Sequence, residues 1–134
     1  MAFNNTNNIH IRYSDIDSMG HVNNAVYLSY FEEARISFFK SLVGEDWNWE
    51  DNGIIIARNE IDYHLPVLFN DIVSIRTSAH EVGNKSFTLY YELLAKRQEL
   101  EFICASGKSV AVCFDYRSKQ TVAVPEAWKI AMLS

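Results

Sequence analysis

Residues 23–44 read NNAVYLSYFEEARISFFKSLVG, and this stretch determines how the rest of the chain can be arranged. Apolar side chains recur at every third or fourth position: Tyr27, Phe31, Ala34, Phe38 and Leu42. Such spacing places them on one face of an α-helix. Asn23 or Asn24 can cap the first turn, and Gly44 can end the last one. The sequence therefore predicts one amphipathic helix, the only long helix in the chain.

Alternating or continuous apolar residues predict strands on both sides of this helix. They lie at residues 9–13, 54–63, 73–79, 87–93, 101–114 and 121–124. Gly83-Asn84 and the charged residues 96–99 are typical of short turns, and turns of hairpin length join antiparallel neighbours. Pro125 is tolerated at the first position of a helix, so we expect a short terminal helix to begin there.

With one helix and one sheet, the apolar face of the helix has a single surface against which it can pack. We expect an α+β domain over residues 9–134, in which an antiparallel sheet of five or six strands presents its concave face to the helix. A ferredoxin-like arrangement would need a second long helix between the later strands, and the sequence predicts none. The Asn-rich residues 1–8 are expected to form a flexible tail.

The composition argues against several classes of function. A net charge of −5 disfavours nucleic-acid binding, because such binding depends on a basic surface that neutralises phosphates. No apolar run approaches the roughly 20 residues that span a bilayer, and the first residues carry no export signal, so no membrane association is expected. Cys104 and Cys113 form no CxxC pair, which favours buried, reduced thiols in a cytoplasmic protein. His10, His64 and His80 lack metal-ligand spacing and are given no role.

Residues 12–24, RYSDIDSMGHVNN, bring carboxylates, a histidine and asparagines to the start of the helix. The N–H groups of a first helical turn lack partners within the helix, and the helix dipole adds partial positive charge there. A developing oxyanion is stabilised at such a place. Asp15 and Asp17 can each cap a turn or act as nucleophile or general base. His21 can transfer protons or orient the loop.

This segment resembles the motif of the hotdog-fold acyl-CoA thioesterases of the 4-hydroxybenzoyl-CoA thioesterase type. The similar residues are Asp17-Ser-Met-Gly-His21-Val-Asn23-Asn24 with Tyr27, and then Phe31-Glu-Glu-Ala-Arg35. The likeness continues at Ile61-Asp-Tyr-x-x-Pro66, Asn70-Asp71, Gly83-x-x-Ser86-Phe87 and Val124-Pro125-Glu126. The resemblance covers nearly the whole chain from residue 9 and implies the hotdog fold, a long central helix wrapped by an antiparallel sheet.

The resemblance also implies a site and an activity. Asp17 would be the catalytic carboxylate of an acyl-CoA thioesterase, as nucleophile or as base for water, with Asp15 structural and paired with Arg12. The backbone N–H near Asn24 would polarise the thioester carbonyl, and His21 would assist or orient the loop. Substrate contacts are expected from Asn23, Tyr27, Asn84, Lys85 and Ser86. No metal or redox cofactor is expected, and the assembly would be a homodimer or homotetramer with sites at subunit interfaces.

Other functions remain open at this point. A hotdog protein can bind acyl-CoA without turning it over, but binding alone has no need for a carboxylate beside the thioester. A related HVNN motif occurs in plant-type thioesterases that act on acyl carrier protein, so the carrier is open. A hotdog dehydratase would need a histidine and a carboxylate poised for β-elimination, and His21 alone does not favour it. Another branch of hotdog thioesterases uses a helix carboxylate, but the loop Asp already fills that role, which leaves Glu32 and Glu33 on a solvated or interface surface.

Overall fold

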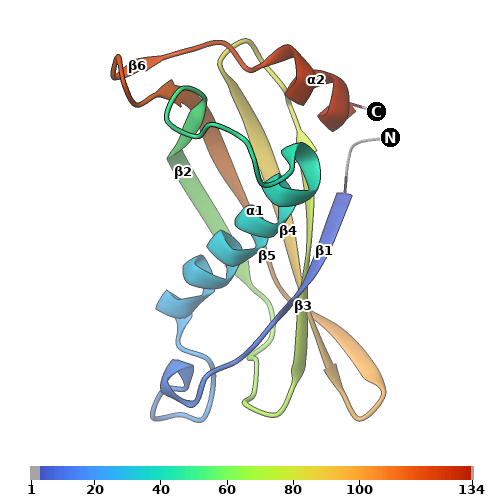
Figure 1. Ribbon diagram of the computed structural model, residues 1–134. Coiled ribbons are helices and arrows are strands. Elements are labelled where there is room, and N and C mark those ends of the chain that lie inside the picture. The colour runs from blue at the N-terminus through green and yellow to red at the C-terminus, as the bar shows by residue number, and fades with distance from the viewer. Residues whose placement is uncertain (1–3, 134) are drawn as a thin grey trace.

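The computed structural model of the protein describes residues 4–133 (Figure 1). Six strands form one antiparallel sheet in the order β1-β3-β4-β5-β2, with β6 paired to β5. The strands are β1 Asn4–Ile9, β2 Gly53–Tyr63, β3 Ile72–His80, β4 Ser86–Arg97, β5 Leu100–Asp115 and β6 Gln120–Thr121. The helices are α1 Tyr27–Val43 and α2 Glu126–Leu133, and two 3-10 turns, η1 Tyr13–Asp15 and η2 Asn24–Val26, precede α1. The sheet curls around α1, which confirms the predicted α+β architecture.

Helix α1 forms where the apolar spacing predicts it. Its buried residues are Tyr27, Tyr30, Phe31, Ala34, Phe38 and Phe39. The Asn23 side chain caps the preceding turn by accepting a hydrogen bond from the Ala25 N–H at 2.9 Å. Gly44 ends the helix with a φ of 79°, a left-handed conformation that glycine adopts without steric cost. Within residues 4–133, no helix is both long enough and apolar enough to cross a membrane.

The inner face of the sheet receives the apolar side of α1. The Phe31 ring stacks on Tyr91 of β4, with ring centroids 4.6 Å apart. Gly107 of β5 lies directly beneath this pair, because a Cβ atom there would come within 2.9 Å of the Phe31 ring. The helix therefore approaches β5 closely at this point.

The N-terminal segment differs from the prediction. Residues 4–8 belong to β1, which pairs antiparallel with β3, so the prediction of a flexible tail is wrong for them. Asn5 also donates to the Ser37 hydroxyl of α1 at 3.0 Å and accepts from Ser41 at 2.9 Å. Backbone pairing at a sheet edge needs no apolar side chains, which is why the hydrophobic pattern did not indicate this strand. Residues 1–3, the remainder of the expected tail, lie outside the described residues.

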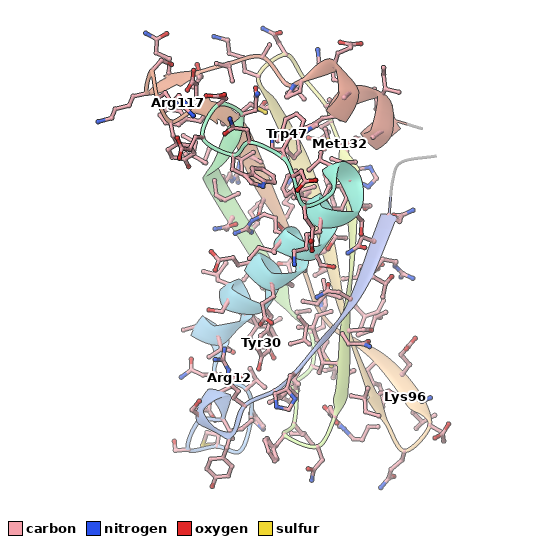
Figure 2. The ribbon with its side chains drawn as sticks, in the orientation of Figure 1. Arg12, Tyr30, Trp47, Lys96, Arg117 and Met132 are labelled. Carbon is pink, nitrogen blue, oxygen red and sulfur yellow. The ribbon has the colours of Figure 1, made fainter. Side chains whose placement is uncertain are left out.

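The two ends of the molecule are built differently. At the α2 end, Trp128 is fully buried and contacts Trp47, Trp49, Phe39 and Phe87, with ring centroids 5.3–6.1 Å apart. The opposite end carries η1, the loop before α1 and the connection from β2 to β3. Figure 2 shows Trp47 at the first end and Arg12 at the second. One end is thus closed by an aromatic cluster and the other by hydrogen-bonded loops.

Candidate active site

The loop between η1 and η2 is a tight, hairpin-like turn that presents Asp17. An antiparallel bridge between Ile16 and Val22 closes it. Within the turn, the Asp17 N–H donates to the His21 carbonyl at 2.8 Å, and the Gly20 N–H donates to the Asp17 carbonyl at 3.1 Å. Gly20 has a φ of 83°, a conformation that most side chains would strain. The local sequence therefore fixes the backbone of Asp17 from both sides.

The two oxygens of the Asp17 carboxylate have different environments. Oδ1 accepts hydrogen bonds from the Met19 N–H at 2.9 Å and from the His21 N–H at 3.3 Å. Oδ2 has no hydrogen-bond partner among residues 4–133. The carboxylate is half-buried, so one oxygen orients the group while the other stays available for chemistry.

A free backbone donor lies at the start of the helical segment. Asn23 satisfies two N–H groups of the first turn, that of Ala25 through its side chain and that of Val26 through its carbonyl. The Asn24 N–H has no acceptor within the described part of the chain. The Asn24 carbonyl is held by the Tyr63 hydroxyl, which donates to it at 3.0 Å. The result is a fixed N–H group, at the positive end of the helix dipole, that can donate a hydrogen bond to a ligand oxygen.

Asp17 and Asn24 line the same pocket. This pocket has a volume of about 220 Å³ and is bordered by Asp17, His21, Val22, Asn24, Tyr27, Tyr63, His64, Leu65 and Pro66. The structure thus brings together four of the predicted site residues: Asp17, His21, Asn24 and Tyr27. Asn23 does not line the pocket, and its side chain acts as the cap.

Tyr27 serves as both core residue and pocket wall, the two roles that spacing could not separate. It is 2% exposed, and its ring packs edge-on against Tyr63 with centroids 5.0 Å apart. Burial raises the pKa of Tyr27 to about 12, so its hydroxyl stays protonated at neutral pH. Tyr27 therefore offers the pocket a neutral surface rather than a second negative charge.

Sequence reasoning missed the far wall of the pocket, which comes from residues 63–66 at the end of β2 and just beyond it. Tyr63 anchors Asn24, and His64 pairs through Nε2 with the Ser106 hydroxyl at 2.9 Å. The Ile61-Asp-Tyr-x-x-Pro66 motif was the available signal, because the likeness to the thioesterases included it. His64 was given no role because it lacks metal-ligand spacing, but that criterion does not bear on whether a residue lines a pocket.

Asn84, Lys85 and Ser86 lie at the other end of the molecule from Asp17 (Figure 1). They follow β3, whose nine residues span roughly 30 Å at about 3.3 Å per residue, whereas the Asp17 loop contacts the residues that precede β3. The carbonyls of Asn84 and Lys85 accept from Val124 and Cys113, so this turn holds the chain before α2 against β5. Within a single chain this turn therefore does not share one pocket with Asp17, and the substrate contacts predicted for Asn84, Lys85 and Ser86 stay a prediction that would need a second copy of the chain.

The pocket was also compared with the side-chain geometry that a metal ion requires. Over residues 4–133, no group of three or more His, Cys, Asp and Glu side chains is arranged to hold a metal ion. The pocket offers His21, His64 and a single carboxylate, and one of these histidines is already paired with Ser106.

Comparisons with known proteins agree with this fold. The chain matches the model of the Thioesterase-like superfamily over residues 11–132. The acyl-CoA thioesterase YbgC of Haemophilus influenzae is 28% identical over 126 residues, which cover 92% of this chain and 90% of that protein. The solved structure of a Thermus thermophilus thioesterase complexed with coenzyme A and zinc is 32% identical, with a TM-score of 0.81 and coverage of 96% and 97%.

Proteins of lower sequence identity share this fold. A structure of 4-hydroxybenzoyl-CoA thioesterase in complex with 4-hydroxybenzoyl-CoA superposes with a TM-score of 0.86 at 14% identity, covering 96% of this chain and 98% of that one. The chain belongs to the Thioesterase-like superfamily and has the hotdog fold. The predictions of this fold, of this family and of thioester hydrolysis as the class of reaction are confirmed.

Proposed function

We propose that this protein hydrolyses an acyl-CoA thioester to a free acid and CoA, with Asp17 as the catalytic carboxylate. One observation carries the proposal: Asp17, which has a carboxylate oxygen without a partner, and Asn24, which has an N–H without an acceptor, line the same pocket. The first is a nucleophile or base and the second is an electrophilic donor, which are the two components that acyl transfer needs. The names of YbgC and of the CoA-bound Thermus protein support CoA as the carrier.

The geometry suits two routes to the same products. In both, the thioester carbonyl accepts a hydrogen bond from the Asn24 N–H, which stabilises the negative charge that develops on that oxygen. Removing one such donor costs about 2.7–4 kcal/mol in measured enzymes. In the first route, Asp17 Oδ2 attacks the carbonyl carbon, the C–S bond breaks to release CoA thiolate, and water hydrolyses the resulting anhydride. In the second, Asp17 takes a proton from a water molecule that attacks the carbonyl carbon directly, the C–S bond then breaks to give the free acid and CoA thiolate, and the thiolate is protonated.

His21 is suited to assist the departure of CoA. Its backbone groups are both bonded to Asp17, whereas its ring has no hydrogen-bond partner among the described residues, and His21 lines the pocket. An imidazole can act as a general acid, so His21 can deliver a proton to the leaving thiolate. In this proposal Asp17 and Asn24 act on the carbonyl, and His21 acts on the sulfur.

The test measures thiol release from a panel of acyl-CoAs with straight-chain and aromatic acyl groups. We expect at least one to be hydrolysed by the purified protein and not by an Asp17→Asn variant. Calorimetric titration of the same acyl-CoAs separates this outcome from the alternative of a protein that only binds: tight binding without thiol release would refute hydrolysis. Comparing one acyl group on CoA and on acyl carrier protein identifies the carrier, and we expect the CoA ester to be the faster substrate.

We also propose that the reaction needs no metal ion and that the protein works as a homodimer or homotetramer. Activity should survive a chelator, and loss of activity that a divalent ion restores would contradict this. Strand β2 lies at an edge of the sheet, and the apolar residues Leu28, Ile36 and Ile55 of α1 and β2 are 38–56% exposed, which supports association. Light scattering at micromolar concentration should give a multiple of 15.4 kDa. Both cysteines are free and buried, which suits a reducing cytoplasm.

A further inference from the structure

A half-buried ion pair lies where β3 begins and β4 ends, near Lys96 in Figure 2. Asp71 directly precedes β3 and its side chain is only 2% exposed, whereas Arg97 is 37% exposed. Arg97 donates from Nε to Oδ1 and from Nη2 to Oδ2, both at 2.7 Å. Such bidentate ion pairs are both strong and directional. The hydrogen bonds from Arg97 also hold the pKa of Asp71 below its ordinary value, against the opposing effect of burial.

This pair is not needed to align the two strands. Ile72 pairs with Lys96 beside it, and the ladder continues to His80 and Thr88. The pair instead holds the connection from β2 to β3, residues 64–71. Asp71 Oδ2 accepts from the Leu68 N–H at 2.9 Å, and Arg97 Nη2 donates to the Pro66 carbonyl at 3.4 Å.

Residues 64–71 in turn support the loop that carries Asp17. The Val22 N–H donates to the Val67 carbonyl at 2.9 Å, and His21 forms an antiparallel bridge with Leu68. The two backbone groups of His21 are the ones bonded to Asp17, one of them to the carboxylate itself. An uninterrupted series of contacts therefore runs from Arg97 through residues 64–71 and His21 to Asp17 Oδ1.

We propose that Arg97 and Asp71 are positioning residues for the Asp17 carboxylate. Neither of them lines the Asp17 pocket, so they act through the residues they hold. Without the pair, residues 64–71 are released, the His21 backbone shifts, and Oδ2 loses its alignment with a carbonyl bound at Asn24. This inference rests on the proposed function, because it assigns Asp17 the chemistry.

The test compares Arg97→Gln with a matched control, Arg76→Gln. Arg76 lies on β3 and its exposed ion pair with Glu92 joins the same two strands without touching residues 64–71. For Arg97→Gln we expect kcat to fall about tenfold to a hundredfold, since a misplacement of about 1 Å has that cost, with KM changed less than twofold. Arg97→Lys keeps the positive charge but lacks the planar guanidinium that donates to both Asp71 oxygens. Its kcat should therefore lie between those of the parent protein and Arg97→Gln. If Arg97→Gln matches Arg76→Gln in kcat, the proposal is wrong.

A double-mutant cycle separates positioning from general damage. In an Asp17→Asn background the carboxylate is already gone, so Arg97→Gln should reduce the remaining rate no further. A second loss as large as the first would show that Arg97 acts independently of Asp17 and would overturn the proposal. Full activity of Asp17→Asn by itself would instead refute the proposed function, so the two failures are distinguishable.

A measurement without substrate completes the test. Amide hydrogen exchange at Val22 reports its bond to the Val67 carbonyl. We expect this amide to exchange faster in Arg97→Gln than in Arg76→Gln, with both variants folded. Equal exchange rates at Val22 would show that the ion pair does not hold residues 64–71 against the loop. That result would refute the positioning role independently of any activity measurement.

Discussion

Two carboxylates only two positions apart, Asp15 in η1 and Asp17 in the adjoining loop, have opposite environments. Asp15 is 6% exposed, and its Oδ2 accepts from the Tyr30 hydroxyl at 2.7 Å and from the Arg12 N–H at 3.0 Å. Arg12 Nε lies 4.0 Å from its other oxygen. Asp17 is half-buried, with both of its hydrogen bonds on Oδ1. Asp15 is thus buried, with two donors on one oxygen and Arg12 beside the other, whereas Asp17 is less buried and keeps one oxygen free at a pocket.

The difference shows that residue type alone does not assign a role to a carboxylate here. Asp15 anchors the turn to α1, because its partner Tyr30 is fully buried in the helix. Burial and the hydrogen bond to Asp15 raise the pKa of Tyr30, so this hydroxyl remains a donor at any ordinary pH. The expected structural role of Asp15 is confirmed by these contacts, while the catalytic role of Asp17 stays a prediction.

The largest effect is expected for Asp17→Asn. The amide can still accept the two N–H groups on Oδ1, so stability should change by less than about 1 kcal/mol. An amide is neither a base nor a competent nucleophile, and loss of general-base help alone costs about 10²–10⁴ in rate. We expect kcat to fall at least about a hundredfold while KM stays level or drops. Steady-state kinetics with the best acyl-CoA measures both.

The controls for this prediction are Asp15→Asn and Glu33→Gln. Both should leave kcat within a few fold of the parent protein, and Asp15→Asn should act mainly on stability. If one of them abolished turnover while Asp17→Asn stayed active, the comparison between the two carboxylates would be reversed.

A smaller effect, on stability alone, is expected for Tyr30→Phe. This change removes the hydroxyl that donates to Asp15 and leaves a buried carboxylate with one donor fewer. Hydrogen bonds to charged groups contribute about 1.5–3 kcal/mol, and we expect the free energy of unfolding to fall by that amount. Tyr116→Phe is the matched control, because the Tyr116 hydroxyl donates to the neutral Ile54 carbonyl at an exposed position. Equal losses in the two variants, measured by urea unfolding, would remove the argument that Asp15 anchors the turn.

A third carboxylate, Asp71, is expected to make the stability of the protein depend on pH in the acid range. Its pKa is lowered in the folded state by Arg97, from an ordinary value of 3.8, so its contribution is present above that value and is lost as pH falls through the folded pKa. The free energies of unfolding of the parent and of Asp71→Asn should therefore differ by about 1–3 kcal/mol at pH 7 and converge as the pH falls through the lowered pKa of Asp71. Glu92→Gln, in the exposed pair with Arg76, should show a smaller gap at every pH. A difference between the parent and Asp71→Asn that stays constant from pH 7 down to acid unfolding would contradict the ionic contribution.

The parts of the structure that periodicity encodes were predictable from the sequence. The stripe on α1 and the alternation in β3 and β4 each repeat often enough to identify the element and its buried face. β1 was missed because its Asn-rich residues join the sheet through backbone groups. Contacts such as Tyr63 with Asn24, 39 positions apart, leave no periodic signal, so the far wall of the pocket emerged only from the fold. The resemblance selected Asp17 over Asp15, which composition and spacing could not do.

The smallest effect is expected for Lys85→Ala, which tests the other end of the molecule. The Lys85 side chain is exposed and its one contact among residues 4–133 is with the Thr121 hydroxyl at 3.5 Å. Its structural contribution comes from the backbone carbonyl, which accepts from Cys113 and is kept in the variant. Because this turn lies roughly 30 Å along β3 from the Asp17 loop, we expect KM for acyl-CoA to change less than about twofold, with kcat unchanged. A KM raised severalfold at constant kcat would instead show that Lys85 holds the charged nucleotide of CoA. Since one chain keeps the two regions apart, that result would mean that a second copy supplies the turn and that each complete site is built from two chains.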